Sequence, residues 1–149
     1  MSEEWRPPAW IYRETRPPND DAYFENMTRV VFIAGLGWKM IDKKWPNFRK
    51  AFKNFSINEV ASFSSQSVEQ LMKNPGIVRN RVKITAAIHN AKQFQNIRKE
   101  FGSFQRYIDT LDKSNNYASV IKELGKKFNR LGPSSARIFL YSVGERVEH

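Results

Sequence analysis

Apolar side chains recur every three or four residues along most of this chain, which is the spacing of helices with one buried face. The first such stretch runs to about residue 34, and Asn19 or Asp20 can cap its start. A second begins at Trp38 and keeps helical spacing as far as Phe55, although Pro46 is expected to interrupt or restart it. No convincing alternating pattern indicates strands. The chain is therefore predicted to be all-α, with about eight helices and short loops.

The same spacing continues to the C-terminus, and short polar residues, prolines and glycines mark the helix ends. Ser56 and Glu59 have the spacing of a capping box at the start of a short helix. Pro133 suits the first position of the last helix, and Gly144 can close that helix. The helices expected after the second are 57–63, from Ser65 or Ser67 to about 74, about 79–98, 103–111, 116–128 and 133–143.

The N-terminal segment 1–18 has a different pattern, because four prolines are interleaved with Trp5, Trp10 and Tyr12. The prolines make a helix unfavourable, and the aromatic side chains are not typical of a purely disordered tail. We expect an extended arm that packs on a single domain formed by residues 19–149.

Charge and composition limit the class of binding partner but do not identify it. The net charge of +10, from 25 Lys and Arg against 15 Asp and Glu, points to DNA, RNA or an anionic surface. The absence of cysteine excludes thiol catalysis, disulfides and thiolate zinc sites. The acidic N-terminus has no secretory pattern, and the most apolar run, Val30 to Trp38, is too short to span a bilayer. We expect a cytoplasmic protein, nucleoid-associated if the source is prokaryotic.

The segment from Pro75 to Ile84 carries the clearest candidate chemistry. A Pro-Gly turn leads directly into a predicted helix whose first turns carry Arg79, Arg81 and Lys83. Unpaired N–H groups at a helix start can bind a phosphate oxygen, and the cations suit the rest of a nucleic-acid strand. On local spacing alone, an ordinary helix-turn-helix corner with a solvated basic face is an equal interpretation.

Three blocks of sequence extend this observation. The first block is Tyr23-Phe24-Glu25 together with Ala34-Gly35-Leu36-Gly37-Trp38. The second contains Gly76 through Ile84, and the third runs from Gly132 to Gly144. In content and order these blocks resemble the DNA-3-methyladenine glycosylase I family of the helix-hairpin-helix superfamily, which reads Gly-Ile-Ile-Arg-x-Arg-x-Lys-Ile at the second block. Val78 stands where the general hairpin rule has a second glycine, as in that family. The resemblance covers roughly residues 19–144.

The resemblance implies a compact helix-hairpin-helix glycosylase domain. Such enzymes flip a damaged base out of duplex DNA and cleave its N-glycosidic bond. A 3-methylated adenine is cationic and hence an activated leaving group, so little acid–base machinery is needed. The implied protein is a monofunctional, monomeric enzyme of base-excision repair without a cofactor or a membrane partner, which acts on double-stranded DNA containing damaged bases.

The resemblance also implies roles for residues by position. Trp38 would be the stacking platform, while Tyr12 and Trp10 would close the base pocket from the arm. Leu36, next to Gly35, would fill the space that the base leaves. The hairpin residues implied to bind DNA are Gly76, Ile77, Val78, Arg79, Arg81 and Lys83. From the residues alone, the core is the favoured position for Trp38.

Two departures from the family leave an alternative open. Val30 occupies the position, eight residues before Trp38, where the family has a pocket glutamate. The two Cys and two His of the family's zinc site are absent here, although His149 lies about where one His would sit. We expect no metal, with the arm packing in the zinc site's place. A DNA-binding hairpin module with weak or no glycosylase activity, or less directly an RNA-binding helical protein, would also fit.

No catalytic residue can be assigned from the sequence. Asp109 is the nearest candidate for a water-activating aspartate, but we expect it to lie on a solvated helix. We expect Glu25 to be a surface carboxylate and His89 to be a surface or boundary residue. Trp45, Phe48, Phe52 and Phe55 are expected in the core. The cations Lys39, Lys43, Lys44, Arg49, Lys50 and Lys53 form either a solvated face or an extension of the DNA footprint, and Arg130 has the same two interpretations.

Overall fold

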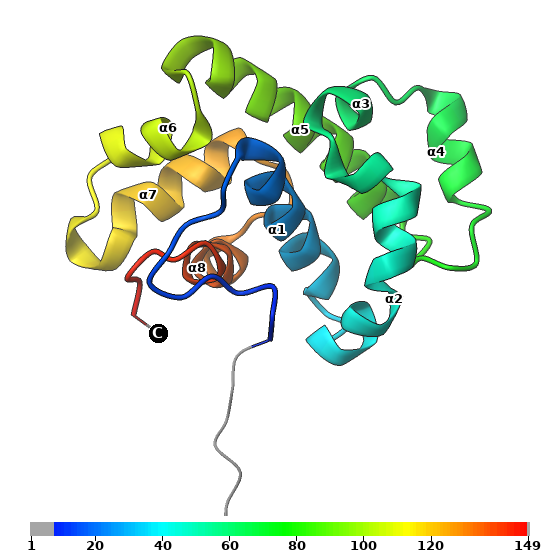
Figure 1. The fold of residues 1–149 in the computed structure, drawn as a ribbon, viewed down its shortest axis with the longest axis horizontal. Helices are drawn as coiled ribbons and strands as arrows, with labels where there is room; N and C mark the ends of the chain where they lie inside the picture. The colour runs from blue at the N-terminus through cyan, green and yellow to red at the C-terminus, as the bar shows by residue number, and fades with distance from the viewer. Residues whose placement is uncertain (1–7, 149) are drawn as a thin grey trace, which may run out of the picture.

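The computed structural model describes residues 8–148, and within that range it has eight α-helices, one 3-10 turn and no strand (Figure 1). The all-α fold predicted from the hydrophobic spacing is therefore confirmed. The helices are α1 Asp20–Ile33, α2 Trp38–Ala51, α3 Ile57–Ala61, α4 Ser65–Leu71, α5 Arg81–Phe101, α6 Phe104–Thr110, α7 Ser114–Lys127 and α8 Pro133–Ser142, with the 3-10 turn at Lys53–Phe55.

Helix α1 lies at the centre of the molecule and joins its two halves (Figure 1). On one side are α2, α3, α4 and the start of α5, and on the other are α6, α7 and α8. Phe24 of α1 is fully buried and meets the rings of Phe55 and Phe94, which come from opposite sides of it. One continuous core therefore holds the helices around α1.

The aromatic stripe of α2 packs inward as predicted. Trp45, Phe48, Phe52 and Phe55 are each at most 2% exposed. Their rings stack in sequence, with the centroids of Trp45 and Phe55 5.1 Å apart and those of Phe52 and Phe55 5.6 Å apart. This ladder fixes one face of α2, so its other face must point to solvent.

Two predicted boundaries in this region are wrong. Pro46 does not interrupt α2, which runs unbroken from residue 38 to 51 with the proline on its exposed side. The helix loses one backbone hydrogen bond there, and packing of the aromatic face offsets that loss. The helix also ends before Phe55, because Lys53, Asn54 and Phe55 adopt positive φ angles near 55° that end the α-helical ladder.

Two later helix starts are shifted from their predicted positions. Ser64, not Ser65 or Ser67, caps α4, and its hydroxyl accepts a hydrogen bond from the Ser67 N–H. The long helix begins at Arg81 instead of near residue 79, since the side chain of Asn80 caps it by accepting from the Lys83 N–H. Both shifts come from side-chain caps that lie one or two residues from the expected ones.

The described part of the arm, residues 8–18, packs on α8, but it runs through turns and bends and is not the extended segment that was expected; Trp5 and Pro7 lie outside the described residues. The Tyr12 N–H donates to the Ser142 carbonyl at 2.9 Å, and Asn26 Nδ2 donates to the Trp10 carbonyl at 3.1 Å. Gly144 approaches the arm so closely that an added Cβ would lie 2.0 Å from the Thr15 oxygen. Only glycine fits this position, because its φ of +87° is also unfavourable for other residues.

Four charged side chains, which we call the docking cluster, hold the arm to the C-terminal segment. Arg16 donates to Asp109 at 2.7 Å and to Glu145 at 3.1 Å, and Lys113 reaches the same two carboxylates at 2.9 and 2.7 Å. The hydrogen bond from Arg16 holds the pKa of Asp109 well below its ordinary value. Asp109 is nevertheless exposed, as expected, with its side chain 44% accessible.

The residues present do not fit the zinc site that the resemblance implied. The chain has no cysteine, and residues 8–148 hold no group of three or more side chains able to ligate a metal. His149 lies outside the described residues, and His89 contacts the Lys127 carbonyl. No helix within residues 8–148 is both long and apolar enough to cross a membrane.

Candidate nucleic-acid interface and base site

The loop between α1 and α2 projects apolar side chains into solvent. Gly35 and Gly37 adopt φ angles of +81° and +84°, and this backbone path turns the chain sharply out of α1. Leu36, Trp38 and Met40 are 38%, 46% and 45% exposed. Adjacent exposed side chains of this size usually mark a binding surface. The predicted wedge Leu36 and stacking residue Trp38 are both accessible.

The hairpin loop 74–80 lies against α2 and offers two free amides. The Gly76 N–H is already bonded to the Asn74 side chain at 2.8 Å, so it is not the phosphate donor that was predicted. The Gly76 carbonyl accepts from Asn47 of α2 at 3.1 Å. The N–H groups of Val78 and Arg79 have no acceptor within residues 8–148. These two amides, of which Val78 was predicted, can therefore meet a phosphate oxygen.

The side chains of the hairpin divide into exposed and buried groups. Arg79 is exposed and forms no ion pair within the described residues, whereas Arg81 is paired with Glu69. Ile77 is 3% exposed and belongs to the core. Of the two exposed arginines of the hairpin, Arg79 is thus the one without a competing carboxylate within residues 8–148.

Lys83 has a different role from the predicted phosphate contact. It is only 5% exposed, and its amine donates to the Phe32 carbonyl at 3.2 Å and the Ala34 carbonyl at 2.5 Å. Burial, together with nearby Arg130, lowers the pKa of this amine. Lys83 therefore satisfies the last carbonyls of α1 and ties the hairpin helix to the apolar loop.

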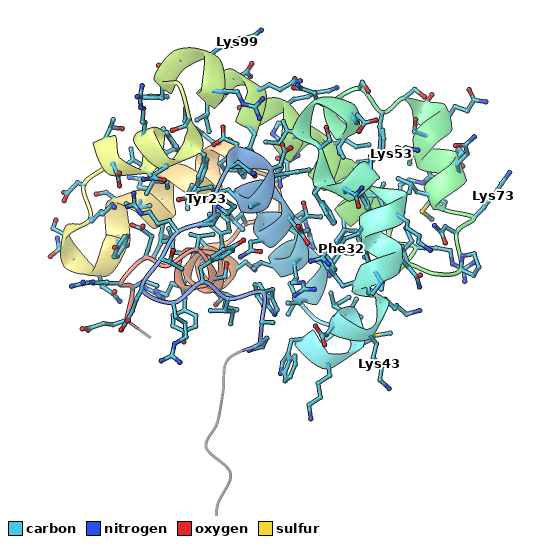
Figure 2. All side chains as sticks on the ribbon, viewed as in Figure 1. Tyr23, Phe32, Lys43, Lys53, Lys73 and Lys99 are labelled. Atoms are coloured by element: carbon cyan, nitrogen blue, oxygen red, sulfur yellow. The ribbon has the colours of Figure 1, made fainter. Side chains whose placement is uncertain are left out.

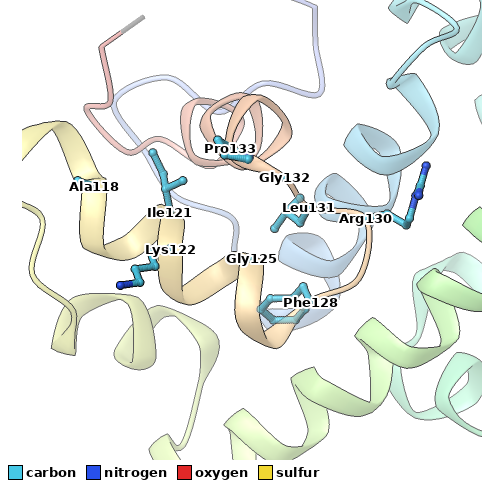
Figure 3. A pocket seen from close by; sticks show the side chains of 9 residues that line it. All are labelled: Ala118, Ile121, Lys122, Gly125, Phe128, Arg130, Leu131, Gly132 and Pro133. Carbon is cyan, nitrogen blue, oxygen red and sulfur yellow. The ribbon is translucent and has the colours of Figure 1, made fainter.

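Arg130 lies close enough to the hairpin helix for its charge to contribute to the lowered pKa of Lys83. Asn90 of α5 holds this segment by accepting from the Asn129 N–H at 2.8 Å and donating to its carbonyl at 3.2 Å. Arg130 itself is exposed with a φ of +61°. In Figure 3 its side chain points away from the other residues lining a pocket of about 570 Å³ between α7 and α8. None of the predicted base-pocket residues lines that pocket.

A second cluster forms where the arm crosses α1 and α2. The guanidinium of Arg29 lies 5.0 Å from the ring centre of Trp10 and 4.4 Å from that of Trp45. Arg29 is 5% exposed, its Nε has no hydrogen-bond partner, and Asp42 is 3.9 Å away. Burial lowers the pKa of Arg29 to about 10, so it stays protonated at neutral pH. Two aromatic faces stabilise this cation in place of water.

Glu25 lies in the same cluster and is not the surface carboxylate that was expected. It accepts hydrogen bonds from the Trp45 indole at 2.8 Å and from Arg49 at 2.9 Å. Burial and the charge of Glu25 raise the pKa of Tyr12. The arm residue Tyr12 thus lies within the electrostatic influence of a carboxylate that already has two partners.

The structure brings together only part of the predicted base pocket. Trp10 and Tyr12 both meet the cluster on α1 and α2, whereas Trp38 is exposed at the start of α2, with the Lys39 amine 5.9 Å from its ring. Val30 is 1% exposed and packs in the core. Sequence reasoning missed Arg29. Its one signal was a charged residue inside the apolar run of α1.

The arrangement suits binding and stacking more than acid–base catalysis. An apolar tip, a free amide and an unpaired arginine lie at the junction of α1, α2 and α5. The two carboxylates considered as catalytic candidates, Glu25 and Asp109, are both engaged by cations. This geometry can hold a strand by its phosphates, enter its base stack and present an aromatic face to a base.

Comparison with known proteins agrees with this geometry. Residues 9–138 match the model of the methyladenine glycosylase family. The chain is 32% identical over 75 residues to a DNA-3-methyladenine glycosylase of Haemophilus influenzae, a match that covers 50% of this chain and 40% of that protein. It is 41% identical over 61 residues to DNA-3-methyladenine glycosylase 1 of Escherichia coli K12, covering 41% of this chain and 33% of that one. The chain thus matches less than half the length of either relative.

Solved structures extend the likeness over most of the chain. A crystal structure of 3-methyladenine DNA glycosylase I superposes with a TM-score of 0.77 at 26% identity, covering 89% of this chain and 82% of the other. A solution structure of 3-methyladenine DNA glycosylase I, used to study alkylated base recognition, gives 0.73 at 26% identity, with coverage of 91% and 80%.

Proposed function

Because the chain belongs to the methyladenine glycosylase family, we propose that it is a DNA glycosylase that excises alkylated, cationic purines of the 3-methyladenine type. The observation that carries this proposal is the exposed pair Leu36 and Trp38, which is joined through Lys83 to a hairpin with a free amide. A wedge, a stacking face and a phosphate site are the parts that base flipping requires.

The proposed reaction needs little from the protein beyond binding. The Val78 amide and Arg79 hold a backbone phosphate, Leu36 fills the gap in the base stack, and the ring of Trp38 stacks on the flipped base. Water then adds to C1′ of the sugar and releases one proton. The electron pair of the N-glycosidic bond passes to the base, which leaves neutral because it was a cation. The product is an abasic site in an unbroken strand.

The alternative is a DNA-binding module with weak or no glycosylase activity, and one observation favours it. Val30 is a buried aliphatic residue at the position where the resemblance implies a pocket glutamate, and Arg29 beside it is a buried cation. A like charge near the pocket opposes a cationic base. We further infer that the protein acts as a monomer on double-stranded DNA, in the cytoplasm and beside the nucleoid in a prokaryote.

Excision from methylated duplex DNA tests the proposal, with release of 3-methyladenine and 7-methylguanine measured separately. Trp38→Ala should reduce release at least a hundredfold yet change the affinity for undamaged duplex less than twofold, because the ring contacts only the flipped base. Ile138→Ala is the matched control, since Ile138 is a 41% exposed apolar residue on α8. Tight duplex binding with no release of either base would establish the inactive alternative.

A further inference from the structure

Half of the net charge of this protein lies on α2 and the first residue of the 3-10 turn that follows it. Between residues 38 and 53 there are six Lys and Arg residues and one acid, Asp42, which gives this segment +5 of the chain's +10. The buried aromatic face of α2 leaves these charges on the opposite, solvent side. Such a concentration raises the local positive potential and attracts polyanions.

The charges of α2 are ordered along one face. Lys39, Lys43, Asn47 and Lys50 follow each other at intervals of four, four and three residues, and all four are exposed. Helical residues at these intervals share a face. We call this set the α2 stripe. It begins next to Trp38 and extends about 16 Å along the helix to Lys50.

Asn47 connects the stripe to the hairpin. Its side chain donates to the Gly76 carbonyl at 3.1 Å, so the hairpin loop lies directly against this face of α2. A Cβ added at Gly76 would come within 3.1 Å of the same Asn47 side chain. The free amide of Val78, two residues on, and the lysines of α2 therefore border one continuous surface.

Within the described part of the chain, the lysines of the stripe have no carboxylate partner, in contrast to two arginines elsewhere on the surface. Arg81 is paired with Glu69 and Arg98 with Asp20. Within residues 8–148, Lys39, Lys43 and Lys50 form no ion pair. An unpaired lysine keeps its full charge available for a phosphate and its counterions.

We propose that the α2 stripe is a second DNA contact surface, which holds the backbone of the duplex beside the lesion. This inference rests on the proposed function only for the identity of the partner as DNA. Phosphates follow one another every 3.4 Å of helix axis in each strand, so the stripe is long enough to follow several of them. The contact supplies affinity without base specificity, because it reaches phosphates alone.

The test compares two double variants with the same spacing. Lys43→Gln with Lys50→Gln removes two charges of the stripe, seven residues apart. Lys92→Gln with Lys99→Gln removes two exposed charges of α5 with the same separation. By helical periodicity this second pair faces away from Lys83, and Figure 2 shows Lys43 and Lys99 on opposite sides of the molecule.

The measurement is the affinity for an undamaged 20-base-pair duplex over a range of salt concentrations. The stripe variant should make the negative slope of log K against log salt shallower by about 2, because each lost phosphate contact removes about 0.9. The α5 variant should have the wild-type slope. Both should melt within about 2 °C of the wild type, because exposed lysines contribute little to stability. Equal slopes for the stripe variant and the wild type would overturn the inference.

Two further outcomes separate this inference from the proposed function. If the wild type releases no base but the stripe variant still shows the lower slope, the glycosylase proposal fails and the second contact stands. If the variant loses affinity for single-stranded RNA of equal length and not for the duplex, the stripe is an RNA surface and the inference is wrong.

Discussion

The docking cluster and the α2 stripe are both rich in charge, yet they are built in opposite ways. In the docking cluster Arg16 and Lys113 each contact two carboxylates, and Glu145 is buried. In the stripe the lysines form no ion pair within residues 8–148. Paired charges fix one segment of the chain on another, whereas unpaired charges remain available to a partner. Pairing, together with the position of a charge on the surface, therefore distinguishes these two regions.

The largest expected effect comes from breaking the docked arm. Gly144→Ala should destabilise the protein by about 2–4 kcal/mol, because the new methyl group meets the Thr15 backbone and the residue has a positive φ. Urea unfolding measures this loss. Gly125→Ala in α7 is the control, since its Cβ would make only an ordinary contact of 3.6 Å with the Leu131 carbonyl. It should be neutral or slightly stabilising. Equal losses in both variants would show that the arm contact does not matter.

Acid should weaken the docking cluster selectively. The pKa of Asp109 is lowered in the folded protein, so its contribution is complete above the unfolded pKa of about 3.9 and disappears as pH falls through the folded value. The melting temperature should therefore fall between pH 5 and pH 2, and less steeply in Asp109→Asn. Glu100→Gln, an exposed change on α5, should keep the wild-type steepness. A wild-type curve that is flat over this range would contradict the ion-pair account.

The smallest effect is expected from a single exposed cation of the hairpin. Arg79→Gln should lower the salt slope of duplex binding by about 1 and leave the melting temperature unchanged, because Arg79 has no partner within the described residues to lose. Arg81→Gln should lower the slope less, since Glu69 already engages that guanidinium. A larger slope change for Arg81 than for Arg79 would reverse this ranking of the hairpin cations.

Sequence reasoning reached the fold and singled out the exposed tip and the hairpin, because these depend on short-range patterns. Helical spacing gave the helices, and the hairpin motif with the Leu36 loop gave the exposed tip. The roles of Lys83 and Glu25 could not be read in this way, because each depends on a partner about 20 to 50 residues away. Arg29 was missed for the same reason, since its environment comes from Trp10 and Trp45 on two other segments.

The buried amine of Lys83 has a mechanical consequence. It fastens the start of α5 to the end of α1, so the proposed phosphate site of the hairpin and the apolar tip at Leu36 are held together. Under the proposed function, the spacing between a bound phosphate and the side chain that enters the base stack would be set before any DNA arrives. A duplex that slides across the protein would then meet the same spacing at each nucleotide. Only a weakly stacked base would be displaced by the tip.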